Sequence, residues 1–321
     1  MRIKLIEDKN IEDFYHFSNE NGTIFNSTNW LKLHSPNLLL YGFFDNTDNL
    51  IGGFYLFKKK QFFINFYKNP PFTPHNGLFL IEKSKNKVKI FSNIKKAISL
   101  IEEEVSKLNY QISSFAFPHN FNNLQPFIWK KYKIIPNYTF IINLSLSENE
   151  ILQNMSTERR NDITRAVKDN INCKLETDYN IVKKLVLNTF NRKSESIDIE
   201  YLDKILFQFT NTQNSFAFVS YHNNLAIASV FCIYDKETAY YLFGGYDSTN
   251  KHHGAGVLAI WNSIQYAQKL NLKYFDFEGS MIPEVEKYFR DFGGDFTPYY
   301  TVNKAIIPIE IVLKFIKRER F

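Results

Sequence analysis

The sequence contains little cysteine: only Cys173 and Cys232 occur in 321 residues. Because disulfides stabilise many secreted proteins, this scarcity favours a reducing compartment, and we expect a cytoplasmic protein. Cys232 lies in the apolar run SVFCIY, which is typical of a buried strand. Neither cysteine has neighbours typical of a catalytic thiol, so thiol chemistry is not expected.

Long apolar runs are also absent. No stretch approaches the 18 or so consecutive apolar residues of a membrane-spanning helix, and the first residues, MRIKLIEDKN, lack the apolar core of a signal peptide. The seven histidines are scattered, and the adjacent His252 and His253 cannot easily face one ion, so we expect no metal. A Gly-x-Ser-x-Gly nucleophile elbow is missing, which argues against a serine hydrolase.

The composition is that of a globular protein, with 44% apolar and 22% charged residues. Aromatic residues are abundant, with 32 Phe and 19 Tyr. They are explained either by AT-rich coding, since Lys, Asn and Ile are also common, or by a surface that contacts lipid, sugar or bases. The net charge of +6 suits an anionic substrate but is too small to indicate a nucleic-acid partner by itself.

Short strings recur in the same order in both halves of the chain. Asn49–Phe54 resembles Asn224–Val230: in both, a polar turn opens into an apolar strand. KLNY (107–110) ends a helical stretch before the strand SSFAF, as KLNL (269–272) does before KYFDF. The repeat predicts an α/β (α+β, mixed-sheet) protein made of two tandem lobes. We place the lobes at 1–145 and 146–321.

The second lobe opens with two helix starts. Ser147 and Glu150 have capping-box spacing, and a further helix is expected to begin at Ser156. The second of these helices is basic. Its candidate contacts to a negatively charged substrate are Arg159, Arg160 and Arg165.

The clearest local pattern is YYLFGGYDSTNKHHGAGVLAIWNSIQYAQKL, in which a strand and a polar loop precede a helix. Apolar residues at three- and four-residue steps give the helix one buried face: Val257, Ile260, Trp261, Ile264 and Ala267. Glycines at a helix start leave backbone N–H groups open to a phosphate or carboxylate, although the same pair also permits tight packing. The predicted donor-binding residues are Lys251, His253, Gly254, Ala255 and Gly256, and Tyr246 is a predicted substrate contact.

Two acids follow at the end of the next strand. In KYFDFEGS, Asp276 and Glu278 are two residues apart, and in a strand ending at Gly279 they face one side while Phe275 and Phe277 face the core. Such a pair is predicted to orient and deprotonate an amine nucleophile, the alternative being a solvated acid and a turn cap. Arg290 is predicted to hold an anionic group, or alternatively to pair with Asp291 or Glu286.

Together these segments resemble the FemAB-type branch of the GNAT acyltransferase superfamily, in order and across nearly the whole chain. Lys251-x-x-Gly254-x-Gly256 is similar to the Arg/Gln-x-x-Gly-x-Gly/Ala loop of GNAT enzymes, with Lys in place of the usual first residue. YFDFEGS and EKYFRDFGG are similar to family strand-end and Phe-Lys/Arg-x-x-Phe-Gly elements, with Glu278 where Gly is frequent. MSTERRNDITRAVKDNINCKLE, TIFNSTNWLKL and NPPFTPHNGL also look like parts of bacterial FemAB-like proteins.

The resemblance implies two GNAT-like lobes and a transferase that needs no metal. FemAB relatives attach amino acids from aminoacyl-tRNA to peptidoglycan stem peptides, and other members of the superfamily use acyl-CoA. We therefore expect an acyl or aminoacyl group to move onto an amine of a cell-envelope or polysaccharide precursor, lipid-linked or free. The donor, acyl-CoA or aminoacyl-tRNA, acts as a substrate rather than a tightly bound cofactor.

Other interpretations of the sequence stay open. One is a GNAT-like module that binds a cell-envelope precursor without transferring anything. Another is nucleic-acid binding, for which the stacking aromatics and the strong charge are lacking. The basic, aromatic tail at 314–321 is either a solvated end or a peripheral contact with the inner face of a membrane.

Overall fold

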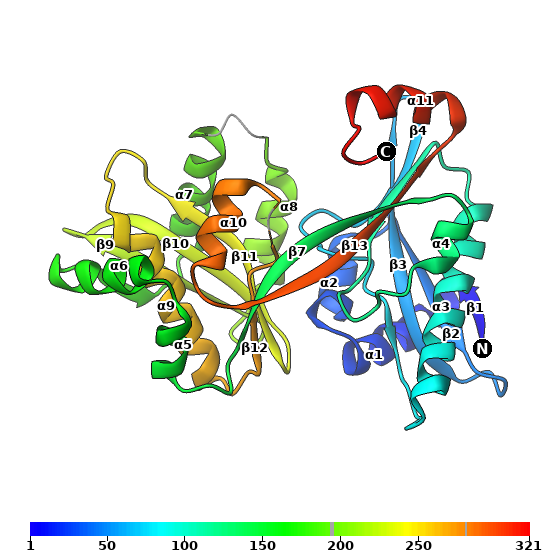
Figure 1. The fold of residues 1–321 in the computed structure, drawn as a ribbon, viewed down its shortest axis with the longest axis horizontal. Helices are drawn as coiled ribbons and strands as arrows, with labels where there is room; N and C mark the ends of the chain where they lie inside the picture. The colour runs from blue at the N-terminus through cyan, green and yellow to red at the C-terminus, as the bar shows by residue number, and fades with distance from the viewer. Residues whose placement is uncertain (193–195, 280) are drawn as a thin grey trace. The chain divides into compact units, whose positions relative to one another are not determined.

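The computed structural model describes residues 1–192, 196–279 and 281–321. By internal packing the chain divides into unit 1, Met1–Asn137 with Pro298–Phe321, and unit 2, Tyr138–Thr297 (Figure 1). The predicted lobes, 1–145 and 146–321, differ from these units chiefly in the last segment. That segment packs in unit 1 because strand β13 (Asp295–Ala305) pairs there with β6 (Ile112–Ala116).

Unit 1 contains a mixed sheet with the order β1-β2-β3-β4-β6-β13, and β5 pairs with β3. Neighbours are antiparallel except β4 and β6, which are parallel. The remaining strands are β1 (Arg2–Leu5), β2 (Leu38–Phe44), β3 (Leu50–Gln61), β4 (Ile64–Lys68) and β5 (Phe79–Leu80). The helices are α1 (Ile11–Asn21), α2 (Thr28–Leu33), α3 (Lys87–Lys107), α4 (Gln125–Trp129) and α11 (Ile307–Ile316).

Unit 2 contains a second mixed sheet with the order β7-β12-β11-β10-β9-β8, in which only β11 and β12 are parallel. Its strands are β7 (Lys133–Asn143), β8 (Asn172–Leu175), β9 (Ser215–His222), β10 (Leu225–Tyr234), β11 (Thr238–Tyr246) and β12 (Tyr274–Asp276). Its helices are α5 (Glu148–Asn154), α6 (Thr157–Lys168), α7 (Tyr179–Arg192), α8 (Ile199–Lys204), α9 (His253–Lys269) and α10 (Pro283–Arg290).

The two sheets have the same topology, which confirms the predicted tandem α/β repeat. In each unit a run of four antiparallel strands, β1–β4 or β8–β11, precedes a long helix, α3 or α9, and the strand after the helix lies parallel to the fourth. The first hairpin of each unit turns through left-handed residues, Asp48 in unit 1 and Asn223 and Asn224 in unit 2. Asp and Asn tolerate that conformation best among residues with a side chain, which is why the polar turns were recognisable.

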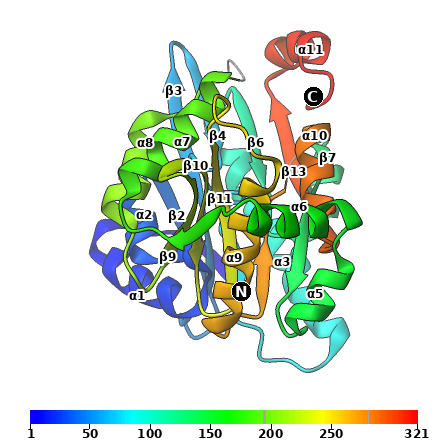
Figure 2. The same ribbon diagram turned by 90° about the vertical axis from the view of Figure 1, so that its left-hand side faces the viewer.

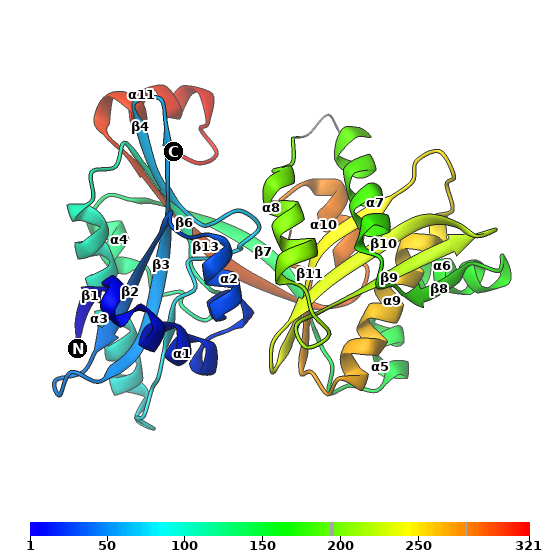
Figure 3. The ribbon, with the colours of Figure 1, turned by 180° about the vertical axis from the view of Figure 1, so that it is seen from behind.

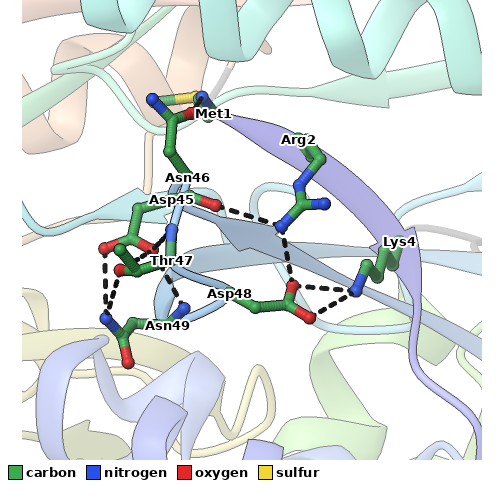
Figure 4. Close-up of polar contacts among 8 residues, drawn as sticks. All are labelled: Met1, Arg2, Lys4, Asp45, Asn46, Thr47, Asp48 and Asn49. Atoms are coloured by element: carbon green, nitrogen blue, oxygen red, sulfur yellow. Dashed lines mark hydrogen bonds and ion pairs between the residues drawn. The ribbon is translucent and has the colours of Figure 1, made fainter.

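The turn between β2 and β3 shows how such a sequence fixes a hairpin (Figure 4). Oδ1 of Asp45 accepts the backbone N–H groups of Thr47 at 2.8 Å and Asn49 at 3.0 Å. The carboxylate of Asp48 accepts hydrogen bonds from Lys4 at 2.8 Å and Arg2 at 3.1 Å. The turn is therefore closed by its own side chains and tied to strand β1, although such exposed ion pairs contribute little energy.

One end strand of each sheet comes, in chain order, directly after strands that belong to the other unit. Strand β7 comes after β6 of unit 1, but its residues 141–143 pair with β12 in unit 2. Strand β13 comes after β12 of unit 2, but its residues 301–305 pair with β6 in unit 1. This exchange places the segment after β13 with unit 1.

Helices cover both faces of the sheet in unit 2 (Figure 3). Helix α9 buries Val257, Ile260, Trp261, Ile264 and Ala267, as predicted. On the other face α7 packs on β10, where the rings of Tyr179 and Phe231 lie 5.7 Å apart. The predicted helix starts at Ser147 and Ser156 are also confirmed, since both side chains cap. Within the described residues no helix has the length and apolarity needed to cross a bilayer.

Candidate functional site

The parallel strands β11 and β12 separate soon after they meet. They pair from Thr238 opposite Tyr274 to Tyr240 opposite Asp276, where β12 ends. Strand β11 continues to Tyr246 and stays paired with β10 on its other side. The described pairing of β11 with β12 therefore ends at Tyr240 and Asp276, and the chain after β12 leads directly into the turn that holds Glu278.

The predicted acids lie where the strands separate, but not on one strand face as predicted. Strand β12 ends at Asp276 rather than Gly279, and Glu278 is left-handed, with φ of 59°. The alternation of a strand fails here because Glu278 and Gly279 turn the chain, and a Cβ on Gly279 would lie 2.2 Å from the carbonyl oxygen of Tyr138. Ser280, the last residue of the YFDFEGS segment, lies outside the described residues.

Asp276 and Glu278 are coupled to each other by geometry. Asp276 is buried, and its Oδ1 accepts the hydroxyl of Thr139 at 2.5 Å and the backbone N–H of Glu278 at 2.8 Å. Burial raises the pKa of the Glu278 carboxyl well above its ordinary value, and the nearby Asp276 raises that pKa further. A left-handed residue with a side chain is strained, and strained acids with raised pKa values concentrate at functional sites.

The N-terminus of α9 is partly occupied by its own cap. Nδ1 of His252 accepts the N–H of Gly254 at 3.2 Å, and Nε2 of His252 lies 3.0 Å from the Asp169 carboxylate. These partners assign the neutral tautomer with the proton on Nε2. The predicted donor residues Lys251 and His253 are exposed on either side of this cap.

The two glycines of the loop have different surroundings. A Cβ on Gly254 would lie 2.2 Å from the backbone oxygen of Asp162 in α6, so Gly254 permits close helix packing. A Cβ on Gly256 would meet only the Tyr288 hydroxyl, at 3.2 Å. Ala255 is buried. The packing alternative therefore accounts for Gly254, while Gly256 is open enough to allow close approach to its backbone.

Two of the predicted substrate arginines are engaged within unit 2. Arg159 is 8% exposed, and its Nη1 donates to Asp162 at 2.5 Å while its guanidinium lies 4.8 Å from the Tyr288 ring centroid. Asp291 is 3.8 Å away. Nη1 of Arg160 donates to the carbonyls of Met155, at 2.5 Å, and Gln153, at 3.2 Å, at the end of α5.

The other predicted cations are exposed. Arg165 lies on the outer side of α6. Arg290 is not held between aromatic rings but pairs with Glu286 at 3.3 Å, with 55% of its side chain exposed, so the surface alternative holds. Tyr246 is half-buried, and its hydroxyl accepts the backbone N–H of His252 at 3.1 Å, which ties the end of β11 to the cap of α9.

An aromatic cluster links the strand ends to these helices. The Phe277 ring lies 4.8 Å from Phe289, 5.4 Å from Phe292 and 6.1 Å from Tyr241. Tyr288 continues the cluster towards Arg159 and Gly256. The acidic turn, α10, α6 and the start of α9 thus meet around shared side chains.

Several residues of this arrangement were not predicted from sequence: Thr139, Asp162, Tyr240, His252 and Tyr288. Tyr240, His252 and Tyr288 lie in segments that the sequence singled out, but no pattern marked these three residues themselves. The contacts of Thr139 and Asp162 come from elements distant in the chain, which no local pattern reveals.

Other chemistries find little support in the described parts of the chain. Burial raises the pKa of Cys173 to about 11 and that of Cys232 well above its ordinary value, so both thiols stay protonated. Residues 1–192, 196–279 and 281–321 contain no group of three or more His, Cys, Asp or Glu side chains arranged to hold a metal ion.

Comparison with known proteins agrees with the class that this geometry suggests. Residues 200–290 match the family described as "Acetyltransferase (GNAT) domain". The match covers β11, α9, β12 and α10, which are four of the elements that form the site. Residues 200–290 are thus similar to a GNAT acetyltransferase domain, in agreement with the resemblance seen in the sequence.

Solved structures extend the likeness to the whole chain. FemX is similar with a TM-score of 0.67 at 12% identity, covering 98% of this chain and all of FemX. L-PGS from Bacillus licheniformis is similar with a TM-score of 0.58 at 10% identity, covering 99% and 98%. A tandem GNAT protein from the clavulanic acid pathway has a TM-score of 0.50 at 7% identity, covering 95% and 98%. At these identities the likeness establishes a tandem GNAT fold, and no curated protein matches the sequence.

Proposed function

We propose that this protein transfers an acyl or aminoacyl group from an activated donor onto an amine of a cell-envelope or polysaccharide precursor. The observation that carries the proposal is a strained, half-buried acid, Glu278, which lies just after the point where the pairing of β11 and β12 ends. The acid provides a proton acceptor next to the proposed donor site at β11 and the start of α9. The donor is acyl-CoA or aminoacyl-tRNA.

The donor is proposed to bind along β11 and at the start of α9. An extended donor would lie beside β11, near the point where the pairing with β12 ends. Its phosphate groups would then approach the helix start at Gly256, where the helix dipole favours negative charge. The exposed cations Lys251, Arg165 and Arg290 add positive charge around this unit.

The chemistry is proposed to be direct transfer. The amine nitrogen attacks the donor carbonyl carbon, the bond to the thiol or ribose oxygen breaks, and the leaving group takes a proton. Glu278 accepts the proton that the amine loses, and burial raises the pKa of its carboxyl, which makes the carboxylate a stronger base. The carboxylate of Asp276 accepts a hydrogen bond from the backbone N–H of Glu278. The negative charge of Asp276 also raises the pKa of the Glu278 carboxyl.

The acceptor class rests on resemblance to FemAB-type proteins and on similarity in fold to FemX and L-PGS. The proposed acceptor carries a free amine and is lipid-linked or soluble. We therefore place the reaction in the cytoplasm, where both donors are made.

A donor screen tests the proposal. The purified full chain is incubated with a panel of acyl-CoA thioesters or with charged tRNA and amine acceptors, and products are found by mass shift. With the active pair, Glu278→Gln is expected to lower turnover about a hundredfold while donor affinity is kept. Glu237→Gln, at an exposed glutamate paired with Lys273, is the matched control and should leave turnover unchanged.

Two outcomes contradict the proposal. Unchanged turnover in Glu278→Gln would mean that the base lies elsewhere or that proximity alone suffices. Tight donor or precursor binding without transfer to any acceptor would instead favour the non-catalytic binding module.

A further inference from the structure

Helix α11 in unit 1 presents apolar side chains to solvent on one broad face. Ile307, Ile311 and Phe315 follow one another at four-residue steps, and Val312 and Ile316 lie beside them. We call these residues the α11 face. They are 54–84% exposed, and none of the residues of α11 is buried. A soluble surface normally avoids an apolar patch of this extent, so the α11 face is suited to a partner.

The helix is fixed in place although its outer face is uncovered. The N–H of Ile306, just before α11, donates to the carbonyl of Gln111 at 3.0 Å. After the helix, Nζ of Lys133 donates to the carbonyls of Arg318 and Phe321, both at 2.7 Å. Phe321 is buried. The α11 face is thus held outward by anchors at both ends.

A second apolar projection lies at the same end of unit 1. The β3–β4 hairpin turns at Phe62 and Phe63, which are 85% and 94% exposed. All three ribbon views place this hairpin tip and α11 at the upper end of unit 1, most clearly Figure 2. Phe62 has a φ of 52°, where a two-residue turn favours Gly or Asn. Folding therefore does not explain the two aromatic residues.

Positive charge surrounds both projections. Lys58, Lys59 and Lys60 are exposed on the strand that leads to the hairpin tip. The exposed residues that follow the α11 face include Lys317, Arg318 and Arg320, with Glu319 as the one acid among them. Apolar and aromatic side chains bordered by lysine and arginine match the surface of a bilayer with anionic lipids.

We propose that the α11 face and the hairpin tip dock unit 1 onto an anionic lipid bilayer. The α11 face and the two phenylalanines would enter the boundary between headgroups and acyl chains, and the lysines would meet the phosphates. A protein partner or a second copy of the chain would use the apolar residues without needing anionic lipid. This inference does not depend on the proposed acyl transfer, because none of these residues belongs to the candidate site in unit 2.

Vesicle co-sedimentation of the full chain tests the inference. We expect binding to vesicles of equal parts phosphatidylcholine and phosphatidylglycerol, and much weaker binding to phosphatidylcholine alone. K58Q/K59Q/K60Q should weaken partitioning about a hundredfold. I311Q/F315Q should weaken it at least about tenfold. F91Q, at an exposed phenylalanine of α3, is the matched control and should bind as the unchanged protein does.

The hairpin offers a variant that separates docking from folding. F62N/F63G installs the preferred Asn-Gly turn, so it should keep or raise thermal stability while vesicle binding falls about tenfold or more. Undiminished vesicle binding in both F62N/F63G and I311Q/F315Q would overturn the proposal. The proposal would also be overturned if the unchanged protein did not bind vesicles but formed a dimer in solution that I311Q/F315Q dissociates. Transfer to a soluble acceptor should be unaffected in every variant, which keeps this test separate from that of the proposed function.

Discussion

Gly254 and Gly256 lie two residues apart in α9, yet the structure predicts opposite effects for their replacement by alanine. In Gly254→Ala the new methyl would meet the backbone oxygen of Asp162 at 2.2 Å and the Cβ of Ala166 at 2.8 Å. Ordinary carbon contacts are about 3.5 Å or more, so α6 and α9 must move apart by about 1 Å. That movement disturbs the cluster of Ala166, Ile171, Ala255 and Leu258.

The expected cost is that of overpacking a core, about 1–3 kcal/mol. Alanine recovers part of it through better helix propensity, which leaves a net loss of about 2 kcal/mol and a fall in Tm of about 6 °C. Gly256→Ala meets only the tip of the Tyr288 side chain, at 3.2 Å. Its Tm should therefore stay or rise by about 3 °C.

Differential scanning calorimetry of the two variants measures this contrast, and urea unfolding gives the free energies. Equal shifts in both variants, or a neutral Gly254→Ala, would refute the close-packing argument. Donor binding gives a second comparison. Gly256→Val is expected to abolish donor affinity while the fold persists, because the valine side chain blocks approach to the backbone at the start of α9. Gly256→Ala leaves most of that space open. Retained affinity would show that the start of α9 is only packing.

Three further predictions concern the polar groups of unit 2. Folding raises the pKa of Glu278, so the free energy of unfolding falls as the pH rises from the unfolded pKa of about 4.5 through the folded pKa. In urea unfolding, Glu278→Gln should be as stable as the unchanged protein at pH 4 and more stable at pH 8. A difference in stability that does not change with pH would contradict this. Arg159→Met leaves Asp162 and Asp291 without their cation and should lower the free energy of unfolding by about 3 kcal/mol. Arg165 is exposed on the same helix, so Arg165→Met should change this free energy by no more than about 0.5 kcal/mol. Equal losses of stability in thermal unfolding would contradict the different surroundings of the two arginines. Thr139→Val removes the hydroxyl that donates to buried Asp276, so it should lower the free energy of unfolding in urea by about 2 kcal/mol, while Thr139→Ser keeps the hydroxyl and should cost much less. Equal losses in the two variants would show that this hydrogen bond contributes little.

The repeat in the sequence was enough to predict two similar α/β lobes, because polar turns, apolar strands and amphipathic helices leave local patterns. The α9 face and the caps at Ser147 and Ser156 were predictable for the same reason. The exchange of β7 and β13 was not, since strand partners distant in the chain leave no local signal.

The site was predictable in its types of residue but not in their geometry. Sequence by itself determined that an acid pair, a glycine-bearing helix start and several arginines would belong to one lobe. Only the tertiary structure decided that Glu278 leaves the strand in a left-handed turn, that Arg159 is buried against Asp162, and that Gly254 serves packing. Each of these outcomes depends on a neighbour brought close by folding, namely Tyr138, Asp162 or α6, and such neighbours are set by long-range packing rather than by spacing along the chain.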